Sequence, residues 1–79
     1  MMSQKASLFL DLRGVTCPEN YVRVKLALEE IAPGQNLEIL LDDGEPMRNV
    51  PRSLKDDGYR IIRAERRGGY FSLEVAGVA

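Results

Sequence analysis

Residues 8–31 read LFLDLRGVTCPENYVRVKLALEEI, and this stretch decides the fold because its hydrophobic spacing changes in the middle. Residues 8–12 alternate between leucine and other side chains, a period of two that is typical of a β-strand. From residue 18 onward the apolar residues recur at helical spacing. The sequence therefore predicts a strand at 8–12, a loop at 13–16, and a helix over 18–31.

The predicted helix has a core face and a smaller apolar pair outside it. On a helical wheel the core face gathers Tyr21, Val24, Ala27, Leu28 and Ile31. Val22 and Leu26 fall outside this face, one turn apart and near the start of the helix. They form either a surface for docking a partner or an ordinary pair of exposed apolar residues, and the sequence leaves both interpretations open.

The rest of the chain predicts one more helix and three more strands. Pro33-Gly34 ends the first helix, and alternation at 37–41 predicts the second strand. Residues 42–46 are expected to form a turn, and residues 47–57 a helix with Pro51 in its first turn or at a kink. Segments 59–66 and 70–75 then predict a hairpin, whose glycine-rich turn is Arg67-Gly68-Gly69.

This order of elements defines the fold class that we predict. A strand–helix–strand crossover implies a parallel pair with a right-handed connection. The whole order gives an α/β (α+β) two-layer sandwich, β-α-β-α-β-β, with a mixed four-stranded sheet and two helices on one face. We expect residues 1–7 to be a flexible N-terminal tail and residues 8–79 to form a single domain.

Composition narrows the classes of function. The chain has 79 residues and a formal net charge of −1, which argues against broad electrostatic binding to nucleic acid or to a membrane surface. The chain shows neither an apolar run of transmembrane length nor the hydrophobic stretch of a signal peptide, so we expect a cytoplasmic protein. A chain this short leaves no room for a large cofactor cavity, so no cofactor is expected.

Cysteine and histidine usage restrict the chemistry further. Cys17 is the only cysteine, so an intramolecular disulfide is excluded and a reducing compartment fits. The chain has no histidine, which removes Cys-His nucleophilic catalysis and most zinc sites, and no metal is expected. A catalyst built on Cys17 would have to rely on the thiolate itself.

The sequence around Cys17 favours chemistry over a purely structural role. Proline is favoured at the first helical position, so Pro18 predicts that Cys17 is the N-cap. Its sulfur would face free backbone N–H groups and the positive end of the helix dipole, which favours the nucleophilic thiolate. The alternative is a small buried apolar residue. Gly14 is expected to let the preceding loop approach closely.

Three charged groups have open interpretations. Arg13, Arg48 and Arg52 either gather near Cys17 or contact a partner's acidic surface, or they are ordinary solvated arginines. The segment 42–45 is expected to be a solvated turn with an N-capping aspartate rather than a cation site. The arginines near the hairpin turn are expected to be basic surface, and direct RNA binding through them is not favoured.

The segment Leu10-Asp11-Leu12-Arg13-Gly14-Val15-Thr16-Cys17-Pro18 resembles the opening of the TusA/SirA-like sulfur-carrier family. The similarity extends from Leu8 to Val75 and continues through Val24–Leu28, Pro33-Gly34, Leu37–Leu41, Asp42-Asp43 and Asn49-Val50-Pro51. The resemblance implies the same two-layer sandwich and a persulfide sulfur on Cys17. It also implies a sulfur-donor protein of the cysteine desulfurase or rhodanese type. The sulfur-acceptor protein would serve tRNA thiolation, cofactor synthesis or sulfur oxidation.

One residue departs from the family's Cys-Pro-X-Pro motif, because Asn20 stands where the second proline is expected. We assign Gly14, Pro18, Glu19 and Asn20 as support for the motif and the helix start. Unlike proline, Asn20 has an N–H, and we expect it to present an extra donor towards the Cys17 sulfur. The predicted function is a small sulfur carrier acting as a sulfurtransferase component. A non-catalytic regulatory module of the same fold and an RNA-binding two-layer module are the alternatives.

Overall fold

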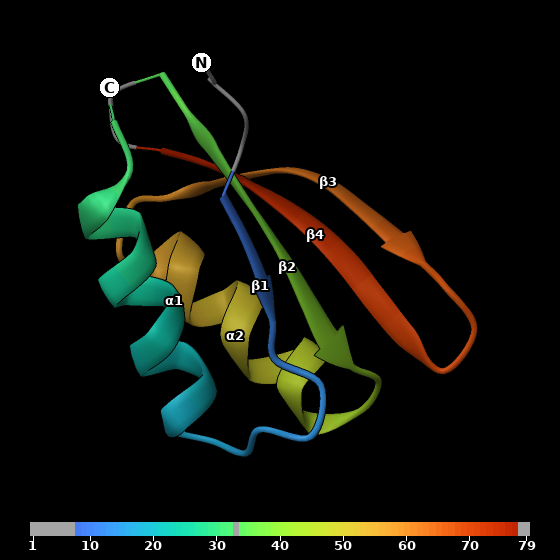
Figure 1. Cartoon of the computed structure of the whole chain (residues 1–79). Helices are drawn as coiled ribbons and strands as arrows, with labels where there is room; N and C mark the ends of the chain where they lie inside the picture. Colours follow the sequence, from blue (N-terminus) through green and yellow to red (C-terminus); the bar gives the residue numbers. More distant parts are fainter. Residues whose placement is uncertain (1–7, 33, 78–79) are drawn as a thin grey trace.

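The computed structural model describes residues 8–32 and 34–77 and has the predicted order of elements (Figure 1). The predicted tail at 1–7, Pro33 and the last two residues lie outside the described residues. The elements are β1 (Leu8–Asp11), α1 (Glu19–Glu30), β2 (Asn36–Asp42), α2 (Glu45–Asp56), β3 (Arg60–Arg66) and β4 (Tyr70–Ala76).

The predicted fold class is confirmed. The four strands form one sheet in the order β1-β2-β4-β3, in which β1 and β2 are parallel and the other two pairs are antiparallel. Both helices cover the same face of this sheet (Figure 1). Because β1 and β2 run in the same direction, their carboxyl ends meet at one edge of the sheet. The segments that lead into α1 and α2 therefore start side by side.

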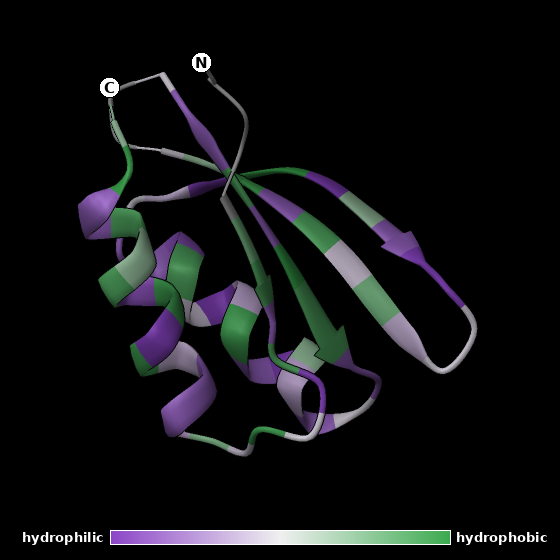
Figure 2. Cartoon of the chain, in the orientation of Figure 1, coloured by the Kyte–Doolittle hydropathy of each residue, from purple (hydrophilic) through white to green (hydrophobic). Residues whose placement is uncertain are grey.

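The hydrophobic core fills the space between the sheet and the helices. On α1, Val24 and Leu28 are 0% and 3% exposed, whereas Val22 and Leu26 are 49% and 56% exposed, which confirms the predicted phase of the helix. The strand residues of the core come from alternate positions, so they share the face that the helices cover (Figure 2). These strand residues are Leu37, Ile39, Leu41, Leu73 and Val75.

The start of α1 differs from the prediction by one residue. The first intrahelical hydrogen bond runs from the Val22 N–H to the Pro18 oxygen, at 3.1 Å, which makes Pro18 the N-cap and Glu19 the first helical residue. Cys17 is therefore the residue before the N-cap. The prediction that Cys17 is itself the N-cap is wrong.

Helix α2, in contrast, begins earlier than expected, at Glu45. Its N-cap is Gly44, which has a φ of +98° and no capping side chain, so the predicted N-capping aspartate is wrong. Because the helix starts earlier, Pro51 lies inside it rather than in its first turn. The helix ends at Asp56, and Gly58 terminates it as predicted: the N–H groups of Gly58 and Tyr59 donate to the oxygens of Lys55 and Leu54.

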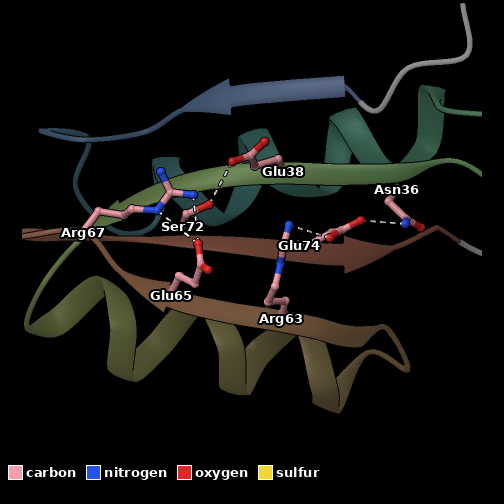
Figure 3. Close-up of polar contacts among 7 residues, drawn as sticks. All are labelled: Asn36, Glu38, Arg63, Glu65, Arg67, Ser72 and Glu74. Atoms are coloured by element: carbon pink, nitrogen blue, oxygen red, sulfur yellow. Dashed lines mark hydrogen bonds and ion pairs between the residues drawn. The ribbon is translucent and has the colours of Figure 1, made fainter.

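The face of the sheet away from the helices is lined by polar side chains that bond across the strands (Figure 3). The Ser72 hydroxyl donates to Glu38 at 2.9 Å, and Glu74 accepts from Asn36 at 2.8 Å and from Arg63 at 3.1 Å. Among the described residues no helix or strand forms a further layer on this face, as expected for a two-layer sandwich.

Candidate functional site

Cys17 lies in the loop between β1 and α1, and its free thiol is exposed. It lines an open pocket of about 360 Å³ at the edge of the sheet where the parallel strands end. The pocket is built from two segments, one after β1 and one after β2. The other lining residues are Gly14, Val15, Thr16, Asp42, Asp43, Glu45 and Pro46.

A set of hydrogen bonds holds the loop that carries Cys17. The Gly14 N–H donates to the Asp42 carboxylate at 2.7 Å, although the two residues are 28 positions apart in the sequence. The Val15 N–H donates to the Leu12 oxygen at 3.1 Å. Gly14 has a φ of +83°, a left-handed backbone conformation that side chains with a Cβ rarely adopt. Gly14 therefore supports the loop by its backbone conformation and not by the close approach that we predicted, because no other described part of the chain, apart from its two neighbours in sequence, lies within 4 Å of the position that a Cβ would take.

Asn20 does not have the role that we predicted. Its backbone N–H donates to the Thr16 oxygen at 3.0 Å, and its side-chain amide donates to the Val15 oxygen at 3.4 Å. Asn20 is also 0% exposed. Its donors therefore bind the loop backbone and are not presented to the Cys17 sulfur, because the loop folds back over the first turn of α1.

Carboxylates, rather than arginines, share the pocket with Cys17. Asp42, Asp43 and Glu45 line it, and none of the three arginines that we singled out does so. Arg13 pairs with Asp11 at 2.7 Å and lies over the Tyr70 ring. Its hydrogen bonds to Asp11 hold the pKa of that carboxyl at about 2. Arg48 and Arg52 are exposed on α2.

Sequence reasoning missed the acidic lining of the pocket, although the sequence contains a signal for it. The predicted parallel pair already implied that the segments after both strands meet at one edge of the sheet. Asp42-Asp43 directly follows the second strand, so it belongs beside the Cys17 loop. One of the carboxylates has a cation nearby, because Arg66 lies 3.4 Å from Asp43.

The outer face of α1 begins next to Cys17. Glu19 pairs with Arg23 at 2.6 Å on this face, and both side chains are about half exposed, which leaves the pair screened by solvent. Val22 and Leu26 lie on the same exposed side of the helix and take no part in the core.

A second group of polar contacts fixes α1 against the end of α2. The Tyr21 hydroxyl and the Lys25 ammonium both donate to Asp57, the latter at 3.0 Å. Burial, followed by the bond to Asp57, raises the pKa of the Tyr21 hydroxyl. The bonds from Tyr21 and Lys25 lower the pKa of the Asp57 carboxyl. These contacts fix the helix that follows Cys17.

The described residues set limits on other kinds of site. Within the ranges 8–32 and 34–77, no group of three or more His, Cys, Asp or Glu side chains is arranged to hold a metal ion. In the same ranges, no helix is long and apolar enough to cross a membrane. The thiol in the open pocket can, as a thiolate, exchange with a disulfide or a persulfide that another molecule brings to it.

Comparison with known proteins places this site in a family. The family model described as Sulfurtransferase TusA matches residues 8–77. A protein of Archaeoglobus fulgidus named "Putative sulfur carrier protein" is 36% identical over 64 residues, which cover 81% of this chain and 73% of that protein. The sulfur carrier protein TusA of Pseudomonas aeruginosa is 23% identical over 70 residues, which cover 89% of each chain.

A solved structure agrees with the sequence comparisons. The crystal structure of a SirA-like protein from Desulfitobacterium hafniense superposes with a TM-score of 0.74 at 27% identity, and the match covers 90% of this chain and 99% of that chain. The family model spans both the Cys17 loop and all six elements of the sandwich. The chain therefore belongs to the TusA family, with the TusA/SirA-like fold.

Proposed function

We propose that this protein is a sulfur carrier that accepts sulfane sulfur as a persulfide on Cys17 and yields it to an acceptor protein. The observation that carries the proposal is the position of Cys17: the only cysteine of the chain is exposed in an open pocket within the span of the TusA model. The names of the relatives, which describe sulfur carriers, support the same function.

The chemistry of loading needs only two sulfur centres. The Cys17 thiolate attacks the outer sulfur of a persulfide on the donor, and a bond forms between Cys17 Sγ and that sulfur. The donor's S–S bond breaks, and its electron pair stays on the donor's cysteine as a thiolate. Delivery repeats the exchange, with an acceptor thiolate as the nucleophile and Cys17 as the leaving thiolate. Electrons balance in each step, so no outside oxidant is required.

The position of Cys17 beside α1 suits an anionic persulfide. Cys17 directly precedes the N-cap of α1, at the end of the helix where the dipole is positive. Asp42, Asp43 and Glu45 act in the opposite sense, because their charges repel an anion in the same pocket.

Partners must reach the sulfur, and the exposed surfaces near Cys17 are where we propose that they dock. Val22 and Leu26 provide an apolar contact one turn into α1, about half exposed at 49% and 56%. Arg48 and Arg52 provide exposed cations for a partner's acidic groups. Arg13 is also exposed, and a partner's acidic group would compete there with its ion pair to Asp11. The donor is a cysteine desulfurase or a rhodanese-type protein, and a cytoplasmic location is part of the proposal.

The test is to load the protein with sulfur and measure its intact mass. The protein is incubated either with a cysteine desulfurase and cysteine or with a rhodanese and thiosulfate. We expect the wild-type protein to gain the mass of one sulfur atom, to lose it on reduction, and to gain nothing as Cys17→Ser. If the folded wild-type protein gains no sulfur from either donor, a regulatory module that has lost transfer becomes the better interpretation.

A further inference from the structure

Asn20 is a buried polar residue in the first turn of α1, and it is 0% exposed. A side-chain amide has two N–H donors and an oxygen acceptor, and burying these groups without partners costs free energy. The hydrogen bonds of Asn20 therefore show what this residue holds in place.

Its donors bind two consecutive carbonyls of the loop that carries Cys17. The side-chain Nδ2 donates to the Val15 oxygen at 3.4 Å, and the backbone N–H donates to the Thr16 oxygen at 3.0 Å. The side chain is itself held, because its Oδ1 accepts the Tyr21 N–H at 2.6 Å. The two residues directly before Cys17 are thus tied to the first turn of α1.

The same loop is also held by Leu12, which directly follows β1, and by Asp42, at the end of β2. The Gly14 N–H donates to the Asp42 carboxylate, and the Val15 N–H donates to the Leu12 oxygen. Residues 14–16 therefore lie between two sets of hydrogen bonds, and Asn20 supplies the set on the side of α1. Cys17 follows this fixed segment directly.

We propose that Asn20 is a positioning residue that fixes the Val15-Thr16 segment and so presents the Cys17 sulfur in one place at the mouth of the pocket. This inference deepens the proposed function and rests on it. A proline at this position would have neither the backbone N–H nor the amide, so it could make neither bond to the loop. In this chain, hydrogen bonds to the loop stand where the Cys-Pro-X-Pro motif has a second proline ring.

Two substitutions separate the bonds. Asn20→Leu has the same number and branching of side-chain heavy atoms, keeps the backbone N–H and removes the amide that binds Val15. Asn20→Pro removes both bonds to the loop. Asn36→Leu is the matched control, because Asn36 also donates through its amide, at 2.8 Å to Glu74, but lies at the far end of β2 from the site. If Asn20→Leu does not fold, Asn20→Ser replaces it.

The first readout is native-state amide hydrogen exchange at Gly14 and Val15, measured relative to Ile39 and Leu73 in the sheet. We expect Asn20→Leu to speed exchange in the loop about fivefold relative to the sheet, the factor that corresponds to one typical hydrogen bond. We expect Asn20→Pro to raise the ratio of loop to sheet exchange rates further, and Asn36→Leu to leave this ratio unchanged. Equal acceleration of loop and sheet amides would mean that Asn20 only stabilises the whole fold, which would overturn the proposal.

The second readout compares sulfur loading from a protein donor with alkylation by iodoacetamide, which needs no docked geometry. We expect Asn20→Leu to slow loading about fivefold, as for one hydrogen bond, and to change alkylation less than about twofold. Faster loop exchange with unchanged loading would contradict a positioning role. Failure of the wild-type protein to load sulfur would refute the proposed function, while hydrogen exchange would still decide whether Asn20 fixes the loop.

Discussion

The charge around Cys17 is the main property of the site at the scale of single residues. Asp42, Asp43 and Glu45 share the pocket with the sulfur, while Arg13 is engaged with Asp11. A negatively charged molecule that approaches the sulfur is therefore repelled, and a partner that delivers sulfur gains from bringing a cation into the pocket.

We predict that the pocket carboxylates select against anionic thiol reagents. Removing one charge, as Glu45→Gln or Asp43→Asn, should raise the rate at which Cys17 reacts with an anionic aromatic disulfide. The increase should be about twofold per charge at low salt, the size of a Coulomb interaction across the pocket in water, and it should shrink as salt is added. Stopped-flow absorbance measures this rate.

Two controls accompany this experiment. The rate with neutral iodoacetamide should change less than the rate with the anionic reagent. Glu30→Gln removes a charge at the other end of α1 and should change neither rate. Equal effects of Glu30→Gln and Glu45→Gln on the anionic reagent would show that net charge, rather than the pocket, sets the selectivity.

At the scale of elements, α1 has two sides with different tasks. Leu28 is 3% exposed in the core, whereas Leu26, two positions earlier, is 56% exposed beside Val22. Packing in the core explains why a leucine stands at position 28. It does not explain the leucine at position 26, because that side chain is largely exposed and its burial contributes little to the stability of the fold.

We predict that these two leucines differ in their effects on stability and transfer. Leu28→Ala should lower the free energy of unfolding by about 2–5 kcal/mol, the usual range for a buried leucine. Leu26→Ala should change it by about 0.5 kcal/mol or less, as for most surface positions. Urea unfolding measures both values.

The same variants test the docking surface. The double variant Val22→Ser with Leu26→Ser should keep the wild-type fold and slow sulfur loading from a protein donor, while its reaction with iodoacetamide stays unchanged. If the double variant loads sulfur at the wild-type rate, Val22 and Leu26 are ordinary exposed residues and partners dock elsewhere.

The accuracy of the sequence analysis differed between periodic and local features. The phase of α1 was predicted correctly, because many residues at regular spacing report on one face. The N-cap was predicted one residue early, because Pro18 is compatible with either position at a helix start. The burial of Asn20 was not predictable, because it depends on the loop folding back over the helix. The acidic residues of the pocket could have been inferred from the predicted parallel strands.

At the scale of the whole molecule, ion pairs that involve carboxylates connect the stability of the sandwich to pH. Hydrogen bonds from Tyr21 and Lys25 lower the pKa of Asp57, and the bonds from Arg13 lower that of Asp11 from 3.8 to about 2. In both cases the unfolded chain binds protons more readily than the folded chain. The stabilisation is therefore present above the unfolded pKa, near 3.8, and is lost as the pH falls through the folded pKa.

We predict that the free energy of unfolding falls as the pH is lowered from about 4 towards 2, because the pKa of Asp11 is about 2 in the folded chain and that of Asp57 is also lowered. Asp57→Asn should lower stability at neutral pH and should flatten this fall. Asp56→Asn, a change at the exposed neighbouring carboxylate, should leave the slope as in the wild-type protein. Denaturant unfolding at a series of pH values gives the slopes. If the free energy of unfolding depends on pH with the same slope in Asp57→Asn and in the wild-type protein, Asp57 does not contribute to the loss of stability in acid.

The most direct test of the central claim, that Cys17 both takes up and hands on sulfur, is a pulse-chase experiment on the intact protein. The protein is loaded with isotopically labelled sulfur from a desulfurase or rhodanese, separated from the donor, and mixed with an unlabelled acceptor thiol. Mass spectrometry then follows the label. We predict that one labelled sulfur appears on the peptide that contains Cys17 and moves to the acceptor as Cys17 returns to a free thiol. A label that never enters at Cys17, or that enters and cannot be passed on, would contradict a carrier function.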